Sequence, residues 1–450
     1  MTNRFSRVVM VAMALAAFCF CAGADDWSAG VGRQVITPTE SMWMSGYAAR
    51  DRPSQGTLHD LWAKALVLQD DSGRQLVLVT LDLVGIGRDL STAICDSLQK
   101  KHQLQRSQIA LCVSHTHTGP VVGHNLISMY SLNAHQKQQV SDYTQFLTQK
   151  ILAAVEQAMA ARKTVSVSFA TGSLDFAVNR RNNREADVPA LREAGELKGP
   201  VDHSLPLLKV ADSAGEPLAI VFGYACHATV LSSYEWSGDW PGFAALEIER
   251  RHPTATAFFV AGCGADQNPL PRRTVELAQH YGQLTADAVD AALPGVSPLP
   301  SVATSAYREI ELQLASLPTK DELQQQAVSD NPYVVSRAKS LLQTWEADGQ
   351  LAPTYPYPVQ KWNLGNQLNM TLLGGEVVVD YSLRIKDSHP DQTIWVAGYS
   401  NDVMAYIPSL RVLREGGYEG ATSMIYYGLP TVWSEQVEEH ICRTVDILLE

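Results

Sequence analysis

The sequence lacks an excess of basic charge. Its 450 residues include 35 lysines and arginines against 47 aspartates and glutamates, which gives a formal net charge of −12. Because nucleic-acid-binding proteins usually present a basic surface, we expect no nucleic-acid partner. Internal repeats and low-complexity tracts are also lacking, so a repeat array is not expected.

Long hydrophobic runs are missing after residue 25. A helix that spans a membrane needs roughly 20 apolar residues, so we expect no transmembrane segment in this part of the chain. Residues 1–24 differ, because two arginines precede the apolar run 8–21, and the small residues 22–24 follow it. This layout is typical of a secretory signal peptide that is cleaved before Asp25. We therefore expect a soluble, exported protein in the periplasm or outside the cell.

Cysteines are few, and their number is odd. Two of the seven lie in the segment 1–24, which leaves five for the exported protein. In an oxidising compartment, an odd number means that at least one thiol stays unpaired within the chain. The five are Cys95, Cys112, Cys226, Cys263 and Cys442.

The remaining composition, with 46% hydrophobic and 18% charged residues, is that of an ordinary globular protein with one large core or two modest ones. Short apolar runs predict strands, and apolar residues at helical spacing predict helices over 136–163 and 274–292. Strands and helices alternate, so the sequence predicts an α/β fold. The predicted strands are 62–68, 76–81, 165–169, 206–210, 219–224 and 257–260.

The segment 293–302 contains three prolines and suits a connection between two lobes. After it, we expect a strand over 307–314, a polar helical stretch over 319–348 and strand-like sequence over 355–379. A helix over 434–449 is predicted to close the chain.

His115 and His117 lie two residues apart, directly after the apolar run 109–113. In an extended backbone, both side chains would point to the same side of the strand. The segment 118–120 contains Gly and Pro and ends the strand, and neutral imidazoles beside such a turn can bind zinc through nitrogen. An isolated pair of this kind is more often a surface or hydrogen-bonded core pair. The motif alone therefore does not establish a metal site.

Four further stretches place polar groups where predicted strands end. Each alone has an ordinary structural interpretation, as a buried histidine, an Asx turn or the start of a helix. Together with the histidine pair, they predict one polar site at the edge of the sheet. The stretches are Cys226-His227, 262–269, Gly374-Gly375-Glu376 and 399–402.

Several motifs resemble those of the catalytic domain of the neutral ceramidases, and they occur in the same order and at similar spacing as in that family. The resemblance runs from about residue 30 to residue 450. It implies mixed β-sheets flanked by helices, in a zinc hydrolase domain over residues 25–450. The motifs are Ile36-Thr37-Pro38, Ser45-Gly46-Tyr47, 114–120, Val178-Asn179-Arg180, Cys226-His227, 266–269, Gly374-Gly375-Glu376 and the region from Ser400 through Tyr406 to Glu419.

The resemblance also implies roles for individual residues. One zinc ion per chain would be bound by four side chains and a water molecule, and other side chains would line the substrate pocket. Zinc lowers the pKa of its water and polarises an amide carbonyl, whereas the pocket residues stabilise the oxyanion and protonate the leaving amine. Whether calcium or magnesium also binds stays open. The implied zinc ligands are His115, His227, Glu376 and Tyr406, and the implied catalytic residues are His117, Arg180, Asn268 and Tyr418.

Two departures from the family pattern bear on the substrate. Neutral ceramidases carry a serine at the position of Asn268, so that hydroxyl is not present here as a nucleophile, and we expect attack by zinc-bound water. The ceramidases also continue into an immunoglobulin-like domain, whereas this sequence stops at Glu450. We expect hydrolysis of an N-acyl amide bond, in a ceramide or a related lipid amide, although the fold and site do not fix the acyl chain or the amine.

Two alternatives stay open beside this amidase. One is a zinc hydrolase of another small amide or ester, such as an acylated amino sugar. The other is a catalytically silent binding protein, against which the retention of all four implied ligands argues. Cys226 and Cys263, which we expect near the metal, would either form a disulfide or stay as two buried thiols.

Overall fold

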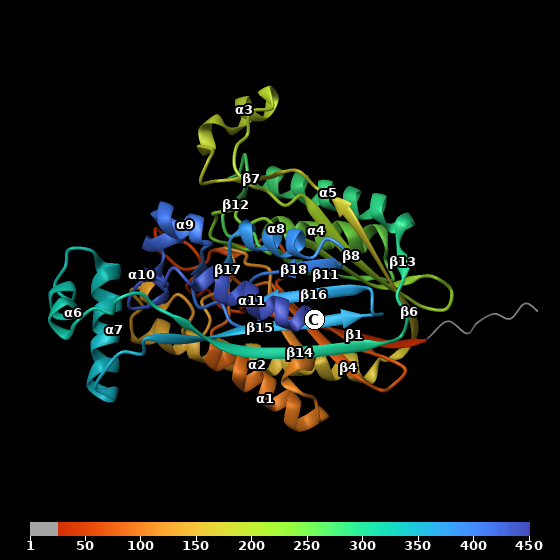
Figure 1. Ribbon diagram of the computed structural model, residues 1–450, viewed down its shortest axis with the longest axis horizontal. Helices are drawn as coiled ribbons and strands as arrows, with labels where there is room; N and C mark the ends of the chain where they lie inside the picture. Colours follow the sequence, from red (N-terminus) through yellow and green to blue (C-terminus); the bar gives the residue numbers. More distant parts are fainter. Residues whose placement is uncertain (1–25) are drawn as a thin grey trace, which may run out of the picture.

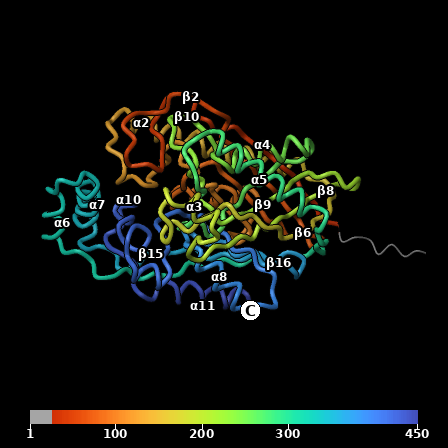
Figure 2. Tube along the Cα trace, turned by 90° about the horizontal axis from the view of Figure 1, so that it is seen from above, coloured from red at the N-terminus to blue at the C-terminus, as the bar shows by residue number. Residues whose placement is uncertain are grey.

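The computed structural model describes residues 26–450, so the expected signal peptide lies outside the described residues. The chain forms four layers, with helices on the outside and two sheets between them. Figure 2 shows the helices α2, α4 and α5 on one side of the strands and α8 and α11 on the other. Mixed sheets with helices on their outer faces confirm the expected α/β class. These helices are α2 (Ala134–Ala160), α4 (Asp239–Arg251), α5 (Val275–Ala292), α8 (Val379–Ser388) and α11 (Val437–Leu449).

The larger sheet has nine strands and contains most of the predicted ones. Its order is β11-β9-β8-β6-β1-β3-β4-β5, with β13 paired to β6. The pairs β4–β5 and β9–β11 are parallel. β5 and β11 lie at opposite ends of this order but contact each other, so the sheet curls around a buried interior. The strands are β1 (Trp27–Val35), β3 (Trp62–Gln69), β4 (Gln75–Leu81), β5 (Ile109–Val113), β6 (Lys163–Ser173), β8 (Ser204–Ala211), β9 (Pro217–Tyr224), β11 (Thr256–Ala261) and β13 (Ser297–Pro298).

Helices cover the outer face of this sheet. Successive side chains of a strand alternate between the two faces of the sheet, so the outer face also carries apolar side chains, and these pack against the helices. The long helix α2 packs on β1 and β3. Its start is fixed by a capping box, in which the Asn133 side chain accepts a hydrogen bond from the Gln136 backbone and the Gln136 side chain accepts one from the Asn133 backbone. The helices α4 and α5 pack on each other, and α1 (Arg88–His102) joins the same apolar cluster.

The second sheet packs on the inner face of the first. It contains β14 (Ala303–Gln313), β15 (Thr354–Leu364), β16 (Leu368–Leu373) and β18 (Thr393–Ala397), in that order. Trp362 and Trp395 from this sheet share one buried cluster with Trp27 and Phe258 from the larger sheet. Apolar side chains of α8 and α11 cover the opposite face. The chain passes from the first sheet to the second through residues 293–302, which include β13.

Two helical segments project from the layers. The helices α6 (Lys320–Gln326) and α7 (Pro332–Asp348) lie at the left of Figure 1, and α3 (Val188–Ala194) lies at its top. The prediction of one helical stretch over 319–348 is therefore wrong, because Asn331 caps a new helix that begins at Pro332. Among the helices of residues 26–450, none has the length and apolar character that crossing a membrane requires.

The polar segments meet at one edge of the two sheets. Isolated bridges join Cys112 to Ser400 and Gly262 to Ala397, so the end of β18 lies between the ends of β5 and β11. The short elements around this edge are β7 (Ala177–Asn179), β12 (Gln267–Pro269), β17 (Glu376–Val377), β19 (Tyr406–Ile407), α9 (Leu410–Glu415), the π-helical turn η5 (Tyr418–Thr422) and α10 (Met424–Tyr427). Elsewhere, β2 (Gly56–Thr57) pairs with β10 (Glu235–Trp236).

Candidate metal centre

His115 and His117 follow β5 in a turn rather than in an extended strand. His115 has a φ of 60°, in the left-handed region that costs a non-glycine residue roughly 1–2 kcal/mol. The expected extended geometry is therefore wrong, yet the two imidazoles still meet, with 3.1 Å between their Nε2 atoms. His115 Nδ1 donates to the carbonyl of Val84 at 2.6 Å, which turns its Nε2 toward His117 and the rest of the cluster.

His227 follows β9 and is oriented in the same way. Its Nδ1 donates to the carbonyl of Gly264 at 2.7 Å, and its own carbonyl accepts a hydrogen bond from Trp240 Nε1 at 2.9 Å. A β-carbon on Gly264 would lie 2.6 Å from the backbone nitrogen of Cys226. Only glycine permits this approach, so the small residues after β11 let the two loops lie against each other.

Glu376 lies on β17, which pairs in parallel with β19 and sets Glu376 opposite Tyr406. Its Oε2 lies 3.0 Å from His115 Nε2 and 3.2 Å from His227 Nε2. Its Oε1 accepts a hydrogen bond from the hydroxyl of Tyr427. The carboxylate is buried, with one oxygen toward the imidazoles and the other toward the phenol.

The protonation of this cluster favours a bound cation. Burial, together with the positive charge of Arg180, lowers the pKa of His227 to about 4. Burial also lowers the pKa of His117 well below its usual range. Burial alone would raise the pKa of Glu376, but the interactions with His115 and His227 hold it well below its usual range. The imidazoles of His117 and His227 are therefore neutral at neutral pH, and the Glu376 carboxylate is ionised.

The donor atoms fit a metal ion. The Nδ1–H groups of His115 and His227 donate to carbonyl oxygens. In the neutral rings, both Nε2 atoms therefore present lone pairs to Glu376 Oε2. This oxygen has no hydrogen-bond partner among the described residues. Lone pairs at this distance repel each other unless a cation lies between them. Tetrahedral zinc with ligands at about 2.0–2.1 Å separates its ligand atoms by roughly 3.3 Å, close to the 3.0 and 3.2 Å seen here. His117 also offers a nitrogen, within 4.8 Å of those of His115 and His227.

The other predicted site residues adjoin this cluster. The Tyr406 hydroxyl lies 3.4 Å from His227 Nε2 and accepts a hydrogen bond from Arg180 Nη2 at 3.1 Å. Arg180 Nη1 donates to Asn268 Oδ1 at 3.2 Å. The ring of Tyr418, which is 40% exposed, packs edge to face on Tyr406, with 5.3 Å between the centroids. The structure thus brings all eight predicted residues together, while their division into ligands and catalytic residues stays a prediction.

Three residues that support this site received no role from the sequence. Glu419 accepts a hydrogen bond from Arg180 Nε at 2.7 Å. Burial raises the pKa of Glu419, but the positive charge of Arg180 outweighs this effect and holds the pKa below its usual range. Tyr399 packs its ring against His115, with 4.4 Å between the centroids. Tyr399 lies in the stretch 399–402 and Glu419 in the region that resembles the ceramidases, so the sequence contains a signal for both. Tyr427, which binds Glu376, lies outside them and gave no signal.

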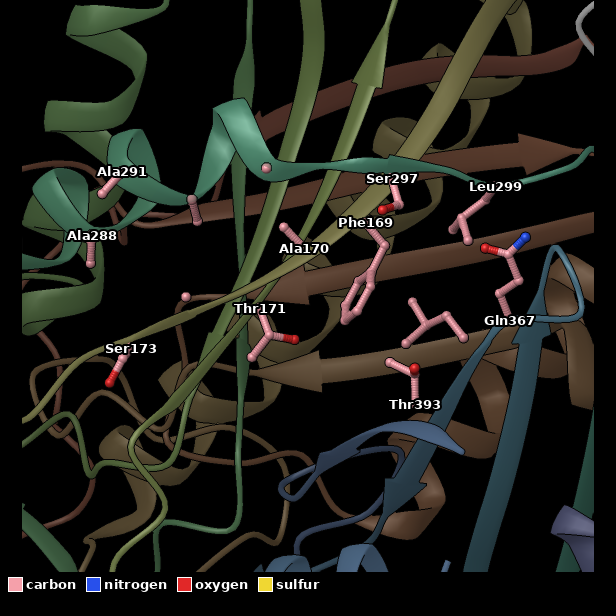
Figure 3. A pocket seen from close by; sticks show the side chains of 14 residues that line it. Phe169, Ala170, Thr171, Ser173, Ala288, Ala291, Ser297, Leu299, Gln367 and Thr393 are labelled. Carbon is pink, nitrogen blue, oxygen red and sulfur yellow. The ribbon is translucent and has the colours of Figure 1, made fainter. Parts of the chain in front are cut away.

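A cavity of about 650 Å³ lies elsewhere, between β6, the end of α5 and the start of β18. Figure 3 shows small, apolar and hydroxyl side chains around it, including Phe169, Thr171, Ala288 and Thr393. The described residues that line it are uncharged, and they do not include the histidines of the cluster. The chemistry of the donor groups, rather than the size of a cavity, locates the candidate site.

The five cysteines of residues 26–450 are free and buried. The disulfide considered between Cys226 and Cys263 is therefore wrong, and the alternative of two buried thiols holds. Burial raises the pKa of both thiols well above the usual range. They are protonated at neutral pH and pack as small apolar side chains.

Comparison with known proteins identifies relatives of this chain. A family profile described as neutral/alkaline non-lysosomal ceramidase, N-terminal, matches residues 27–268. A neutral ceramidase of Drosophila pseudoobscura pseudoobscura is 27% identical over 256 residues, which cover 55% of this chain and 35% of that protein. Neutral ceramidase 1 of Arabidopsis thaliana is 25% identical over 265 residues, which cover 57% and 33%. The chain thus spans about a third of the length of these curated relatives.

Solved structures share the fold. The neutral ceramidase from Pseudomonas aeruginosa superposes with a TM-score of 0.71 at 18% sequence identity, covering 93% of this chain and 73% of that chain. A ceramidase complexed with C2 gives a TM-score of 0.70 at 16% identity, covering 93% and 74%. The likeness thus extends beyond residue 268, to the sheet that carries Glu376 and Tyr406. Since the family profile matches more than half of the chain, this protein belongs to the neutral/alkaline non-lysosomal ceramidase family.

Proposed function

We propose that this protein is an exported, zinc-dependent amidase that hydrolyses the N-acyl bond of a ceramide or a related lipid amide. One zinc ion per chain would be held by His115, His227, Glu376 and Tyr406. The observation that carries the proposal is the meeting of two imidazole lone pairs and a carboxylate oxygen within 3.0–3.2 Å, with both outer ring nitrogens tied to carbonyls. Family membership supports the amide substrate, and the sequence of residues 1–24 supports export to the periplasm or beyond.

When bound, zinc would supply a water of lowered pKa and a Lewis acid for the amide carbonyl. The protein's own groups complete the chemistry. His117 is half-buried beside the cluster, and its Nδ1 has no partner among the described residues, so it is free to take or give a proton. The Arg180 guanidinium carries the positive charge that would stabilise an oxyanion.

Asn268 and Tyr418 are proposed to contact the substrate. Because Arg180 donates to Asn268 Oδ1, the amide nitrogen of Asn268 is turned away from the guanidinium and can donate to a substrate oxygen. Tyr418 is the most exposed aromatic ring of the group, and its hydroxyl keeps its proton because burial of that end raises its pKa well above the usual range. It can therefore donate a hydrogen bond to the leaving amine or to the substrate's head group.

Metal analysis combined with His115→Ala tests this proposal. We expect one zinc per wild-type chain, and loss of zinc together with at least a roughly hundredfold loss of amidase activity in the variant, since even indirect contacts to a metal ligand contribute 10–100-fold. His124→Ala is the matched control, because His124 is exposed and pairs only with Asp89 on the surface. Equal activity of His115→Ala and wild type, with no metal in either protein, would contradict the proposal.

Asn268 favours a second candidate, a zinc hydrolase of another small amide or ester such as an acylated amino sugar. An amide side chain recognises a substrate through hydrogen bonds and does not supply a nucleophilic hydroxyl. Substrate profiling separates the two candidates. Zinc-loaded protein that releases no fatty acid from ceramide but cleaves an acylated amino sugar would establish the second, and a zinc-loaded protein that binds such amides without cleaving any would indicate a silent binding homologue.

A further inference from the structure

The two oxygens of the Glu376 carboxylate have different surroundings. Oε2 faces the Nε2 atoms of His115 and His227 and has no hydrogen-bond partner among the described residues. Oε1 accepts the hydroxyl hydrogen of Tyr427. A carboxylate can bind a metal through one oxygen or through both, and a hydrogen bond to one oxygen favours the first mode. The hydrogen bond from Tyr427 therefore distinguishes the two oxygens of Glu376.

Packing fixes the position of Tyr427. It is the last residue of α10, which lies against α7 and the short 3₁₀ helix η2 (Ile127–Met129). Its ring packs against two separate apolar clusters and lies edge to face with Tyr406, with 6.5 Å between the ring centroids. The packing of α10 against α7 and η2 therefore holds the ring from which the hydroxyl reaches Glu376.

The backbone of Glu376 is fixed independently of Tyr427. Its amide donates to the carbonyl of Ala405 at 2.8 Å, and β17 pairs with β19. With the backbone fixed, the remaining freedom of Glu376 lies in its side-chain torsions, which include rotation of the carboxylate. The Tyr427 hydroxyl restricts that rotation.

We propose that Tyr427 is a positioning residue that holds Glu376 as a one-oxygen metal ligand and so keeps a coordination position open for water or substrate. This inference rests on the proposed metal site. Without the hydroxyl, Oε1 would be free to turn toward the metal and take the open position. A hydrogen-bond partner of a ligand typically contributes 10–100-fold to metal affinity or activity, so the effect is large enough to measure.

Metal binding by Tyr427→Phe tests the proposal without any substrate. The substitution removes one oxygen atom and keeps the ring. We expect the zinc dissociation constant, measured by competition with a chromophoric chelator, to rise by about 10–100-fold. Cobalt(II) replaces zinc as a spectroscopic probe, and we expect weaker visible absorption bands in the variant, because these bands lose intensity as the coordination number rises.

Tyr426→Phe is the matched control, since Tyr426 lies on the same short helix but contacts the rings of Tyr333 and Tyr418. Its zinc affinity and cobalt spectrum should equal those of wild type. Thermal unfolding of the metal-free proteins should agree within a few degrees, which excludes a general structural effect. An unchanged affinity and spectrum in Tyr427→Phe would overturn this inference alone. A wild-type protein that binds neither metal would overturn the proposed function as well.

Discussion

At the scale of single residues, two buried carboxylates have opposite pKa shifts because their partners differ. Glu376 faces imidazoles that keep it ionised, whereas Asp402 accepts a hydrogen bond from the Tyr355 hydroxyl at 2.7 Å through Oδ2. Its Oδ1 has no partner in residues 26–450. Burial raises the pKa of Asp402 to about 7, although the Tyr355 hydrogen bond and Arg88 lower it. The nearby acids Asp89 and Glu309 raise it further.

This pKa predicts how stability depends on pH. An unfolded aspartate titrates near pH 3.9, so folding takes up a proton at Asp402 between about pH 4 and pH 7. The folded protein binds more protons than the unfolded chain in this window, and the contribution of Asp402 to stability therefore falls as the pH rises through it. Asp402→Asn removes this dependence. Above about pH 7 the variant should be more stable than wild type by up to about 4 kcal/mol, because each pKa unit corresponds to about 1.4 kcal/mol.

Urea unfolding at several pH values between about 4 and 8 measures this difference. The stability curves of wild type and Asp402→Asn should converge toward the acid end and separate toward the alkaline end. Asp321→Asn serves as a control, since Asp321 is exposed in the first turn of α6. Parallel curves for wild type and Asp402→Asn would contradict the prediction.

The sequence predicts the site residues only where a pattern surrounds them. His115 and His227 were found because each follows an apolar strand. Tyr406 and Tyr418 were assigned only by resemblance. Tyr427 could not be found, because its role depends on a contact with Glu376, 51 positions away in the chain. Such contacts follow from the packing of α10, which no local pattern encodes.

At the scale of elements, the turn before β17 determines where Glu376 lies. Gly375 has a φ of 74°, and a β-carbon there would lie 2.6 Å from Ile407 Cγ1 and 2.8 Å from the Ala405 carbonyl. Gly375→Ala should therefore push β17 away from β19. We expect weaker zinc binding, measured by chelator competition, and a loss of stability greater than the roughly 1 kcal/mol of left-handed strain alone.

Gly349→Ala provides the comparison for this prediction. Gly349 ends α7 with a φ of 77°, but nothing lies within 4 Å of the position of its added β-carbon. It should show the cost of the backbone conformation without a clash, and zinc affinity should be unchanged. If both variants lose the same stability and bind zinc equally well, contact between β17 and β19 does not fix Glu376.

The elements that the sequence predicts are the ones with strong local patterns. Buried strands such as β4 and β9 appear as mostly apolar runs, and α2 has a clear helical period. α4 was missed because Pro241 and Gly242 lie in its first turn and are typical of a loop. The sequence does not predict α8, because this helix begins at the last residue of the β-branched run 377–379, which favours a strand.

At the scale of the whole molecule, the proposed ligands come from both sheets. His115 and His227 follow strands of the larger sheet, whereas Glu376 and Tyr406 lie on segments that follow strands of the smaller one. A metal that binds these four residues binds only the folded chain. Zinc at 100 times its dissociation constant should therefore stabilise the protein by about 2.7 kcal/mol. Scanning calorimetry with zinc, and after removal of zinc by a chelator, should show a higher unfolding temperature in the first case.

His227→Ala gives the control for the calorimetry, because it removes one ligand from the larger sheet. Its unfolding temperature should be the same with and without zinc. A wild-type protein whose unfolding temperature is insensitive to zinc would mean that the two sheets do not share a metal ion.

The spacing of these four residues along the chain has a consequence for biosynthesis. Translation produces His115 and His227 long before Glu376 and Tyr406, and neither pair alone supplies the complete set of donors. A growing chain therefore lacks the complete set of proposed metal ligands until its synthesis is nearly complete. For the same reason, a truncated product that ends before Tyr406 would lack a proposed ligand, whatever part of it has folded, and we expect it to be inactive.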